Sequence, residues 1–156
     1  MRIKPIAVPT MLPDPPKMLE PPRTMIHSDF VPDNIFFPTS QGGVPFALTD
    51  WQMVGHGRGP YDVAMLCGLL SPDVRRRNER ELLRLYHSRL VERGVHGYSP
   101  DDCWRDYRRS LMSLLFRVAG VIADPGLAEG NEKFRDLWFP RYLSAVVETG
   151  AIEVLP

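Results

Sequence analysis

The chain contains little lysine and few cysteines. Three of its 19 basic residues are lysine (Lys4, Lys17 and Lys133), and the remainder are arginine. Its two cysteines, Cys67 and Cys103, are isolated in apolar helical patterns, with neither a CxxC motif nor a Cys/His spacing. This excludes the usual zinc sites, so we expect both thiols to be reduced and to fill the core.

Net charge and long apolar runs are also lacking. The formal charge is zero at pH 7, so no overall field favours nucleic acid or an anionic membrane as a partner. The longest apolar runs, such as residues 63–70, are too short to cross a bilayer. Prolines interrupt the N-terminus too often for a signal peptide. With 156 residues and 44% hydrophobic residues, we expect one cytoplasmic domain with its own core.

Glycine is absent before Gly42, whereas residues 1–24 contain seven prolines. Because proline fixes φ and lacks an N–H donor, we expect residues 1–24 to form a tail or a strap across the surface. Residues 25–156 then form the folded domain. Its first part, 25–62, contains the polar motifs, and its second part, 63–156, is helical.

The first part of the domain shows strand patterns. Met25-Ile26 predicts a short strand, and residues 35–37 and 46–49 flank a Gln-Gly-Gly turn, which predicts a β-hairpin. Residues 55–60 contain three glycines and predict a flexible loop.

The second part predicts about four helices, two of which start with a serine followed by proline. We expect them at residues 61–70, 72–93, 100–118 and 132–149, with a kink at Pro140. The run Arg75-Arg76-Arg77 is typical of a solvated helix face, whereas Trp104, Trp138 and Tyr142 fit core positions. The fold class is therefore α+β and mainly α.

Four polar residues lie around the predicted hairpin: His27, Asp29, Asn34 and Asp50. Strand pairing brings Asp50 near Asn34, and a carboxylate beside an amide oxygen suits Mg²⁺, which takes few protein ligands plus phosphates. Asp29 is placed to accept a proton from a hydroxyl that attacks such a phosphate. Taken alone, HSDFVPDN (residues 27–34) also fits a capped turn without chemistry.

Three motifs in order resemble one family. His27-x-Asp29-x-x-x-x-Asn34 resembles the HGDxxxxN catalytic loop of the aminoglycoside and choline kinase-like phosphotransferases. Leu48-Thr49-Asp50-Trp51-Gln52 resembles their metal-binding segment, and its DWQ form is similar to the ecdysteroid-kinase-like branch. Residues 57–64 resemble the G-x-G-x-x-D-[LV]-A start of the following helix.

The resemblance implies a kinase-like C-terminal lobe, with residues 25–62 as its catalytic and metal-binding segment. It implies that Asp29 is the catalytic base and that Asn34 and Asp50 hold Mg²⁺ against the phosphates of ATP or GTP. His27 and Asp62 would support the loop. The reaction implied is phosphorylation of a small-molecule alcohol.

Two departures from the family pattern stand out. Ser28 replaces the usual glycine, which costs stability if the position needs a positive φ. The glycine-rich loop and lysine of a nucleotide-binding N-terminal lobe are also missing, since Lys4 and Lys17 lie among prolines. We therefore expect a fragment, a truncated gene product or one piece of a split enzyme. It would expose an apolar face to a missing lobe or to a homodimer partner.

Two alternatives remain open at this stage. The first is a non-catalytic remnant or binding module. The second is a Mg²⁺-dependent phosphohydrolase. The second alternative would rely on Asp29, Asn34 and Asp50. These are few ligands, since such enzymes usually hold two metal ions.

Overall fold

The computed structural model describes residues 22–124, 126 and 130–154. Within them the α-helices are α2 (Pro60–Leu69), α3 (Pro72–Glu92), α4 (Pro100–Ala123) and α5 (Phe139–Thr149). The strands are β1 (Thr24–Ile26), β2 (Ile35–Phe36), β3 (Ala47–Leu48) and β4 (Gly55–Gly57). Short 3-10 turns are η1 (Pro32–Asn34), η2 (Trp51–Met53) and η5 (Ala151–Val154), and η4 (Phe134–Trp138) is a π turn.

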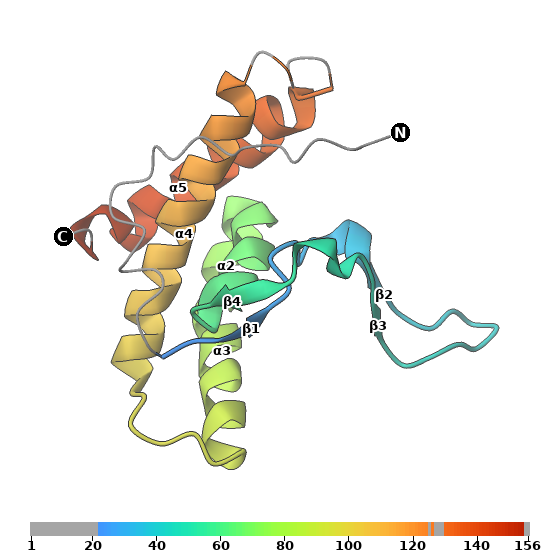
Figure 1. Cartoon of the computed structure of the whole chain (residues 1–156), viewed down its shortest axis with the longest axis vertical. Helices are drawn as coiled ribbons and strands as arrows, with labels where there is room; N and C mark the ends of the chain where they lie inside the picture. Colours follow the sequence, from blue (N-terminus) through green and yellow to red (C-terminus); the bar gives the residue numbers. More distant parts are fainter. Residues whose placement is uncertain (1–21, 125, 127–129, 155–156) are drawn as a thin grey trace.

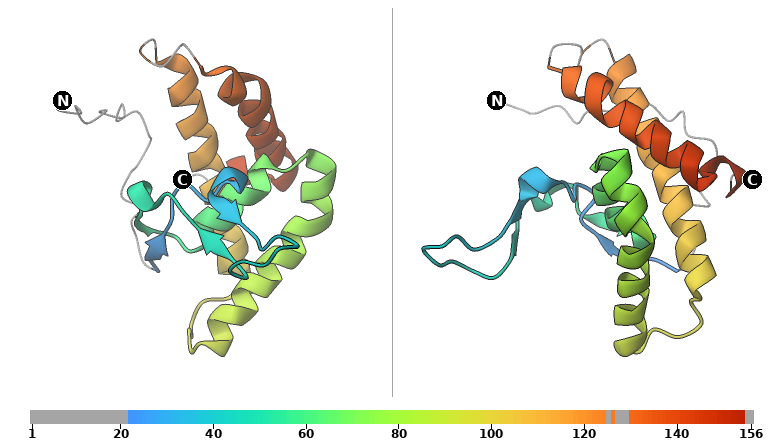
Figure 2. Two further views of the ribbon diagram at one scale, coloured as in Figure 1. Left: turned by 90° about the vertical axis from the view of Figure 1, so that its right-hand side faces the viewer. Right: turned by 180° about the vertical axis from the view of Figure 1, so that it is seen from behind.

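The mainly helical α+β class is confirmed. The helices pack together as one body, and the β2–β3 hairpin projects away from it (Figures 1 and 2). Most of the expected N-terminal tail, residues 1–21, lies outside the described residues. Thr24, expected to end that tail, instead begins β1.

The hairpin forms as predicted, with Ile35 opposite Leu48 in an antiparallel pair. The prediction of a flexible glycine loop is wrong for β4, which pairs antiparallel with β1 and places Ile26 opposite Gly55. A Cβ on Gly57 would lie 2.4 Å from Cδ1 of Ile26. Glycine at that position therefore reflects the close approach of a core side chain rather than loop flexibility.

The helix boundaries follow the serine and proline signals. Ser99 and Asp102 form a capping box at the start of α4: Ser99 Oγ accepts from the Asp102 N–H at 3.0 Å, and Asp102 Oδ2 accepts from the Ser99 N–H at 3.3 Å. The last helix was expected to kink at Pro140, but the irregularity lies before that residue, and Pro140 is in the first turn of α5. A π turn precedes Pro140. In this turn the N–H of Phe139 donates to the C=O of Phe134.

The core lies where α2, α4 and α5 meet. Its fully buried side chains include Cys67 from α2, Tyr107, Leu111 and Leu114 from α4, and Tyr142 from α5. Cys67 and Cys103 are free and buried, as predicted, and burial raises the pKa of each thiol to about 11.

The prediction of a solvated arginine face is wrong for Arg75, which is 1% exposed. Its Nη1 donates to Glu79 at 3.0 Å and its Nη2 to Glu148 at 2.5 Å, while the Tyr107 hydroxyl donates to Glu79 at 3.0 Å. The sequence around Arg75 does not indicate this burial, because the paired carboxylate of Glu148 comes from a helix far along the chain. Arg76, by contrast, is half exposed.

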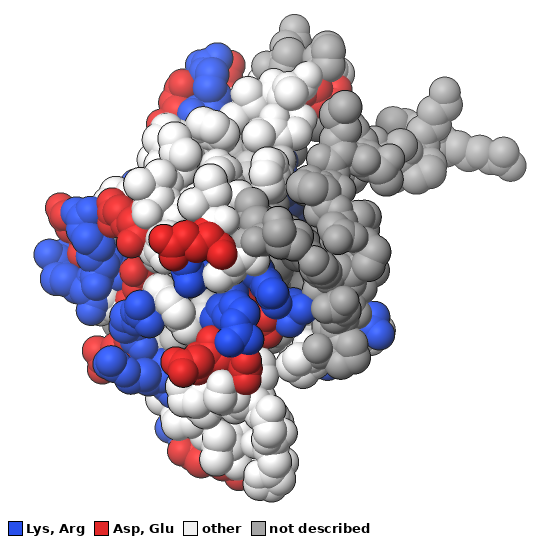
Figure 3. All heavy atoms as spheres, turned by 90° about the vertical axis from the view of Figure 1, so that its left-hand side faces the viewer, with Lys and Arg blue, Asp and Glu red and all other residues white. Residues whose placement is uncertain are grey.

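Charges of both signs are interspersed over the surface in Figure 3. Within the described residues, no helix combines the length and apolar character needed to cross a membrane.

Candidate active site

The backbone of the loop after β1 is held by Asp62, in the first turn of α2. Its Oδ2 accepts a hydrogen bond from the N–H of His27 at 2.7 Å, and its Oδ1 accepts one from the N–H of Ser28 at 3.0 Å. Hydrogen bonds to a charged acceptor are the stronger kind. One carboxylate thus fixes two successive peptide groups of the loop to a helix.

Ser28, which replaces the usual glycine of the family motif, has a positive φ, the case in which a stability cost was expected. Its φ is 65°, and its carbonyl accepts a hydrogen bond from Arg117 Nη1 at 2.6 Å. A left-handed conformation costs a non-glycine residue about 1–2 kcal/mol. Asp62 on one side and Arg117 on the other hold the chain in this conformation.

His27 ties the loop to the end of β3. The ring is 3% exposed, with Nε2 2.9 Å from the Thr49 carbonyl and Nδ1 3.3 Å from the Asp29 N–H. A carbonyl only accepts and an amide N–H only donates, so the tautomer protonated at Nε2 satisfies both contacts. The Trp51 ring packs edge-on against it, with centroids 4.7 Å apart.

The side chains of Asp29 and Asn34 are joined directly. Nδ2 of Asn34 donates to the Asp29 backbone carbonyl at 2.9 Å and to its carboxylate Oδ2 at 3.0 Å. Both partners are acceptors, so this network fixes which end of the amide is the NH₂ group. Oδ1 of Asn34 is left free of any hydrogen-bond donor among the described residues.

A third group, Arg117 of α4, reaches the same carboxylate. Its Nη2 lies 3.8 Å from Oδ1 of Asp29, whose side chain is 25% exposed. Burial raises the pKa of the adjacent Tyr61, and Arg117 partly offsets that rise. Sequence reasoning missed Arg117. The only signal was an arginine within an apolar stretch of a helix far along the chain.

Asp50 is brought beside this cluster by the hairpin. The N–H of Thr49 donates to the Asn34 carbonyl at 3.0 Å, so the ladder continues one residue beyond β2 and β3, and Asp50 follows directly. Asp50 adopts a left-handed backbone, with φ 62°, and among the described residues its exposed carboxylate accepts only a 3.4 Å contact from Gln52. Non-glycine residues held in this region often lie at functional sites.

The donor set fits Mg²⁺ rather than a metal enclosed by protein. No group of three or more His, Cys, Asp or Glu side chains in the described part of the chain could hold a metal ion. Asn34 Oδ1 and the Asp50 carboxylate are hard oxygen donors at the same end of the hairpin, just before β2 and just after β3. Mg²⁺ commonly takes one or two such ligands and completes its shell with water and phosphate oxygens.

The sequence profile of the family described as "Phosphotransferase enzyme family" matches residues 7–110, about two thirds of the chain. The chain belongs to this family. Neither a curated protein nor a solved structure matches it. The match confirms, at the level of the family, the resemblance to kinase-like phosphotransferases. It spans the loop, the hairpin and Asp62, whereas Arg117 lies beyond it.

Proposed function

We propose that the chain carries the catalytic C-terminal lobe of an enzyme that transfers the terminal phosphoryl group of ATP or GTP to a small-molecule alcohol. The observation that supports this most strongly is the Asp29–Asn34 pair. One amide group orients the carboxylate through its NH₂ and keeps its oxygen available for a cation. A capped turn without chemistry does not require that division of roles.

In the proposed reaction, Asp29 accepts the proton of the attacking hydroxyl. The alcohol oxygen forms a bond to the terminal phosphorus, the bond from that phosphorus to the diphosphate oxygen breaks, and the diphosphate carries away the electron pair. Asp29 is suited to this role because it is partly exposed and is oriented by Asn34 and Arg117. His27 and Asp62 position the loop and do not touch the reacting atoms.

Asn34 and Asp50 are the proposed ligands of Mg²⁺, which when bound would neutralise phosphate charge. The left-handed backbone of Asp50 turns the chain directly after Thr49, whose N–H donates to the Asn34 carbonyl. Gln52 contacts the Asp50 carboxylate, and the Trp51 indole N–H donates to the Leu48 carbonyl at 2.9 Å. These contacts hold the segment around Asp50 in place, and the proposed ecdysteroid-kinase-like branch rests on the DWQ form of the segment.

The nucleotide clamp is proposed to come from a further lobe, supplied by a longer polypeptide or by a second one. Large apolar side chains are exposed along the hairpin and the turn after it: Phe36, Phe37, Val44, Phe46, Trp51 and Met53. Water-exposed apolar groups in such a concentration are typical of a surface that contacts another domain. We propose that this surface meets the nucleotide-binding lobe.

The test is transfer of radiolabelled phosphate from ATP or GTP to a panel of small alcohols with Mg²⁺, with and without a co-expressed nucleotide-binding lobe. We expect Asp29→Asn to reduce transfer roughly 10²- to 10⁴-fold, the usual contribution of a general base. Asp33→Asn is the matched control, because Asp33 is exposed and, within the part of the chain that the structure describes, pairs only with Lys133 on the surface.

Equal transfer by Asp29→Asn and the unsubstituted chain would contradict the proposed role of Asp29. Absence of transfer under every condition would favour the non-catalytic binding module. Mg²⁺-dependent phosphate release from a phosphomonoester without nucleotide would favour the phosphohydrolase.

A further inference from the structure

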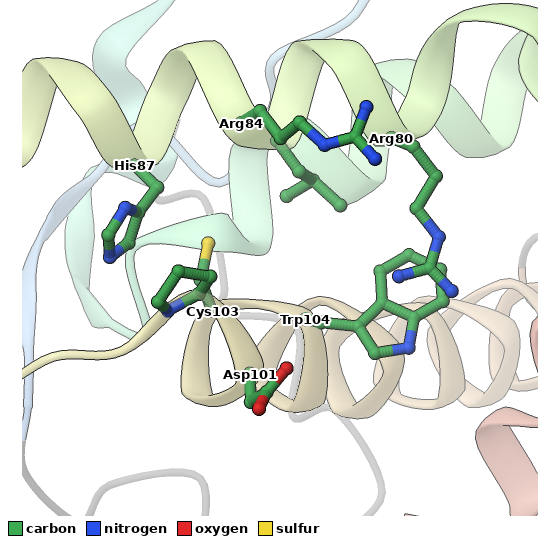
Figure 4. Close-up of a pocket in the computed structure, with 8 residues that line it drawn as sticks. Arg80, Arg84, His87, Asp101, Cys103 and Trp104 are labelled. Atoms are coloured by element: carbon green, nitrogen blue, oxygen red, sulfur yellow. The ribbon is translucent and has the colours of Figure 1, made fainter.

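A groove of about 290 Å³ lies between α3 and α4, away from the Asp29 cluster. Figure 4 shows Arg80, Arg84 and His87 on α3, with Asp101, Cys103 and Trp104 on α4. Trp104 precedes Arg117 by thirteen residues on α4, a rise of roughly 20 Å at 1.5 Å per residue. The groove is therefore distinct from the proposed phosphoryl-transfer site, and the inference drawn from it does not depend on that proposal.

Arg80 is held in place by stacking. Its guanidinium lies 3.2 Å from the centroid of the Trp104 ring, and Trp104 itself stacks on Tyr107 with centroids 5.3 Å apart. A stacked guanidinium uses its flat face and keeps the N–H donors at its edge available for a planar or tetrahedral oxyanion. Arg80 is thus a preorganised donor at the wall of the groove.

Arg84 lies one helical turn after Arg80 and adds a second cation. Among the described residues, no carboxylate lies within ion-pair distance of either guanidinium. By contrast, Arg75, Arg76 and Arg89 of the same helix each pair with an aspartate or a glutamate. Two unpaired cations at i and i+4 repel each other, and a dianion between them would relieve that repulsion.

The other walls limit what else the ligand carries. Leu83 and Cys103 are buried and form an apolar floor. The Nε2 atom of His87 is already engaged within the protein, because it lies 2.8 Å from the Tyr98 carbonyl. Asp101 is exposed on the α4 side, where its carboxylate would accept a hydrogen bond from an ammonium or hydroxyl group and repel a second anion.

We propose that this groove binds a small phosphomonoester, with its phosphate between Arg80 and Arg84 and an ammonium or hydroxyl group toward Asp101. A phosphate carries close to two negative charges at neutral pH, which matches the two unpaired guanidiniums better than a single carboxylate does. The volume suits a ligand of a few heavy atoms, at the lower end of small-molecule sites.

The test is a titration of the ¹⁵N-labelled chain, followed through the indole N–H signal of Trp104, which is assigned by its loss in Trp104→Phe. The probes are O-phosphoethanolamine, inorganic phosphate, ethanolamine and succinate. We expect a saturable shift with O-phosphoethanolamine, a weaker one with phosphate and none with ethanolamine. Succinate binding as tightly as the phosphomonoester would overturn the assignment to phosphate.

Arg80→Gln and Arg84→Gln should each weaken binding roughly tenfold or more, since a hydrogen bond to a charged group contributes about 1.5–3 kcal/mol. Asp101→Asn should reduce the preference for O-phosphoethanolamine over phosphate. Arg89→Gln is the matched control, because nine residues place Arg89 on the opposite face of α3 from Arg80. No Trp104 shift with either phosphate compound, or an equal shift in the arginine variants, would overturn the proposal.

Discussion

At the scale of single residues, Ser28 occupies a strained backbone position between two anchors. The Asp62 carboxylate accepts its N–H, and Arg117 donates to its carbonyl. A motif could indicate that glycine is usual here. The reason becomes clear only from the φ of 65°, which no sequence pattern states.

Ser28→Gly should stabilise the chain by up to about 1 kcal/mol, because relief of the left-handed strain exceeds the extra entropy of a glycine. Urea unfolding would measure this. Ser28→Ala is the control and should unfold like the unsubstituted chain, since alanine keeps the Cβ. A glycine variant no more stable than the alanine variant would show that the position is not strained.

Arg117→Met should destabilise the chain by about 1–3 kcal/mol, because the Ser28 carbonyl and the Asp29 carboxylate both lose a charged donor. Arg77→Met, at an exposed position of α3, is the comparison and should change the free energy of unfolding little. Equal thermal midpoints for the two variants would contradict the role of Arg117.

At the scale of elements, the helices and the hairpin could be predicted because their signals are local. Ser99 and Asp102 lie three residues apart, and a turn of a few residues sets the hairpin. The β1–β4 ladder could not be predicted, since Ile26 and Gly55 are far apart in sequence and glycines favour loops. The contact of Arg117 with the Ser28 carbonyl spans 89 residues and left no local pattern.

Gly57→Ala should destabilise the chain by about 1–3 kcal/mol, as overpacking of a filled site does, because the new methyl would meet Cδ1 of Ile26. Adding Ile26→Val removes that atom and should recover part of the loss. Gly120→Ala is the opposite control: nothing lies within 4 Å of its Cβ, and helix propensity predicts a gain of about 1 kcal/mol. Equal unfolding midpoints for Gly57→Ala and Gly120→Ala would refute the close approach.

At the scale of the whole molecule, the buried thiols should make stability depend on alkaline pH. Burial raises the pKa of Cys67 and Cys103 from 9.0 to about 11, so the folded state binds their protons more tightly than the unfolded state. Their contribution is complete below pH 9 and is lost as the pH rises from 9 to 11. The free energy of unfolding in urea should therefore fall across this window. It should fall less steeply in Cys67→Ala/Cys103→Ala, and equal slopes would contradict this assignment.

The fold and the family follow from motifs along the chain, whereas the proposed chemistry depends on the side chains of Asp29, Asn34 and Asp50. Asp29 and Asn34 are joined by a hydrogen bond, and Asp50 follows the residue paired with Asn34. Sequence alone placed them near one another. It could not show that the NH₂ of Asn34 donates to Asp29, which leaves the amide oxygen for the proposed cation.

The most direct test is paramagnetic broadening by Mn²⁺, as a substitute for Mg²⁺, in the NMR spectrum of the chain with a non-hydrolysable ATP analogue. Broadening should concentrate on the Asn34 side-chain amide and the backbone around Asp50. It should disappear in Asn34→Leu and Asp50→Asn and persist in Asp33→Asn. Broadening centred elsewhere, or unchanged in Asn34→Leu, would contradict a metal–nucleotide site at these residues.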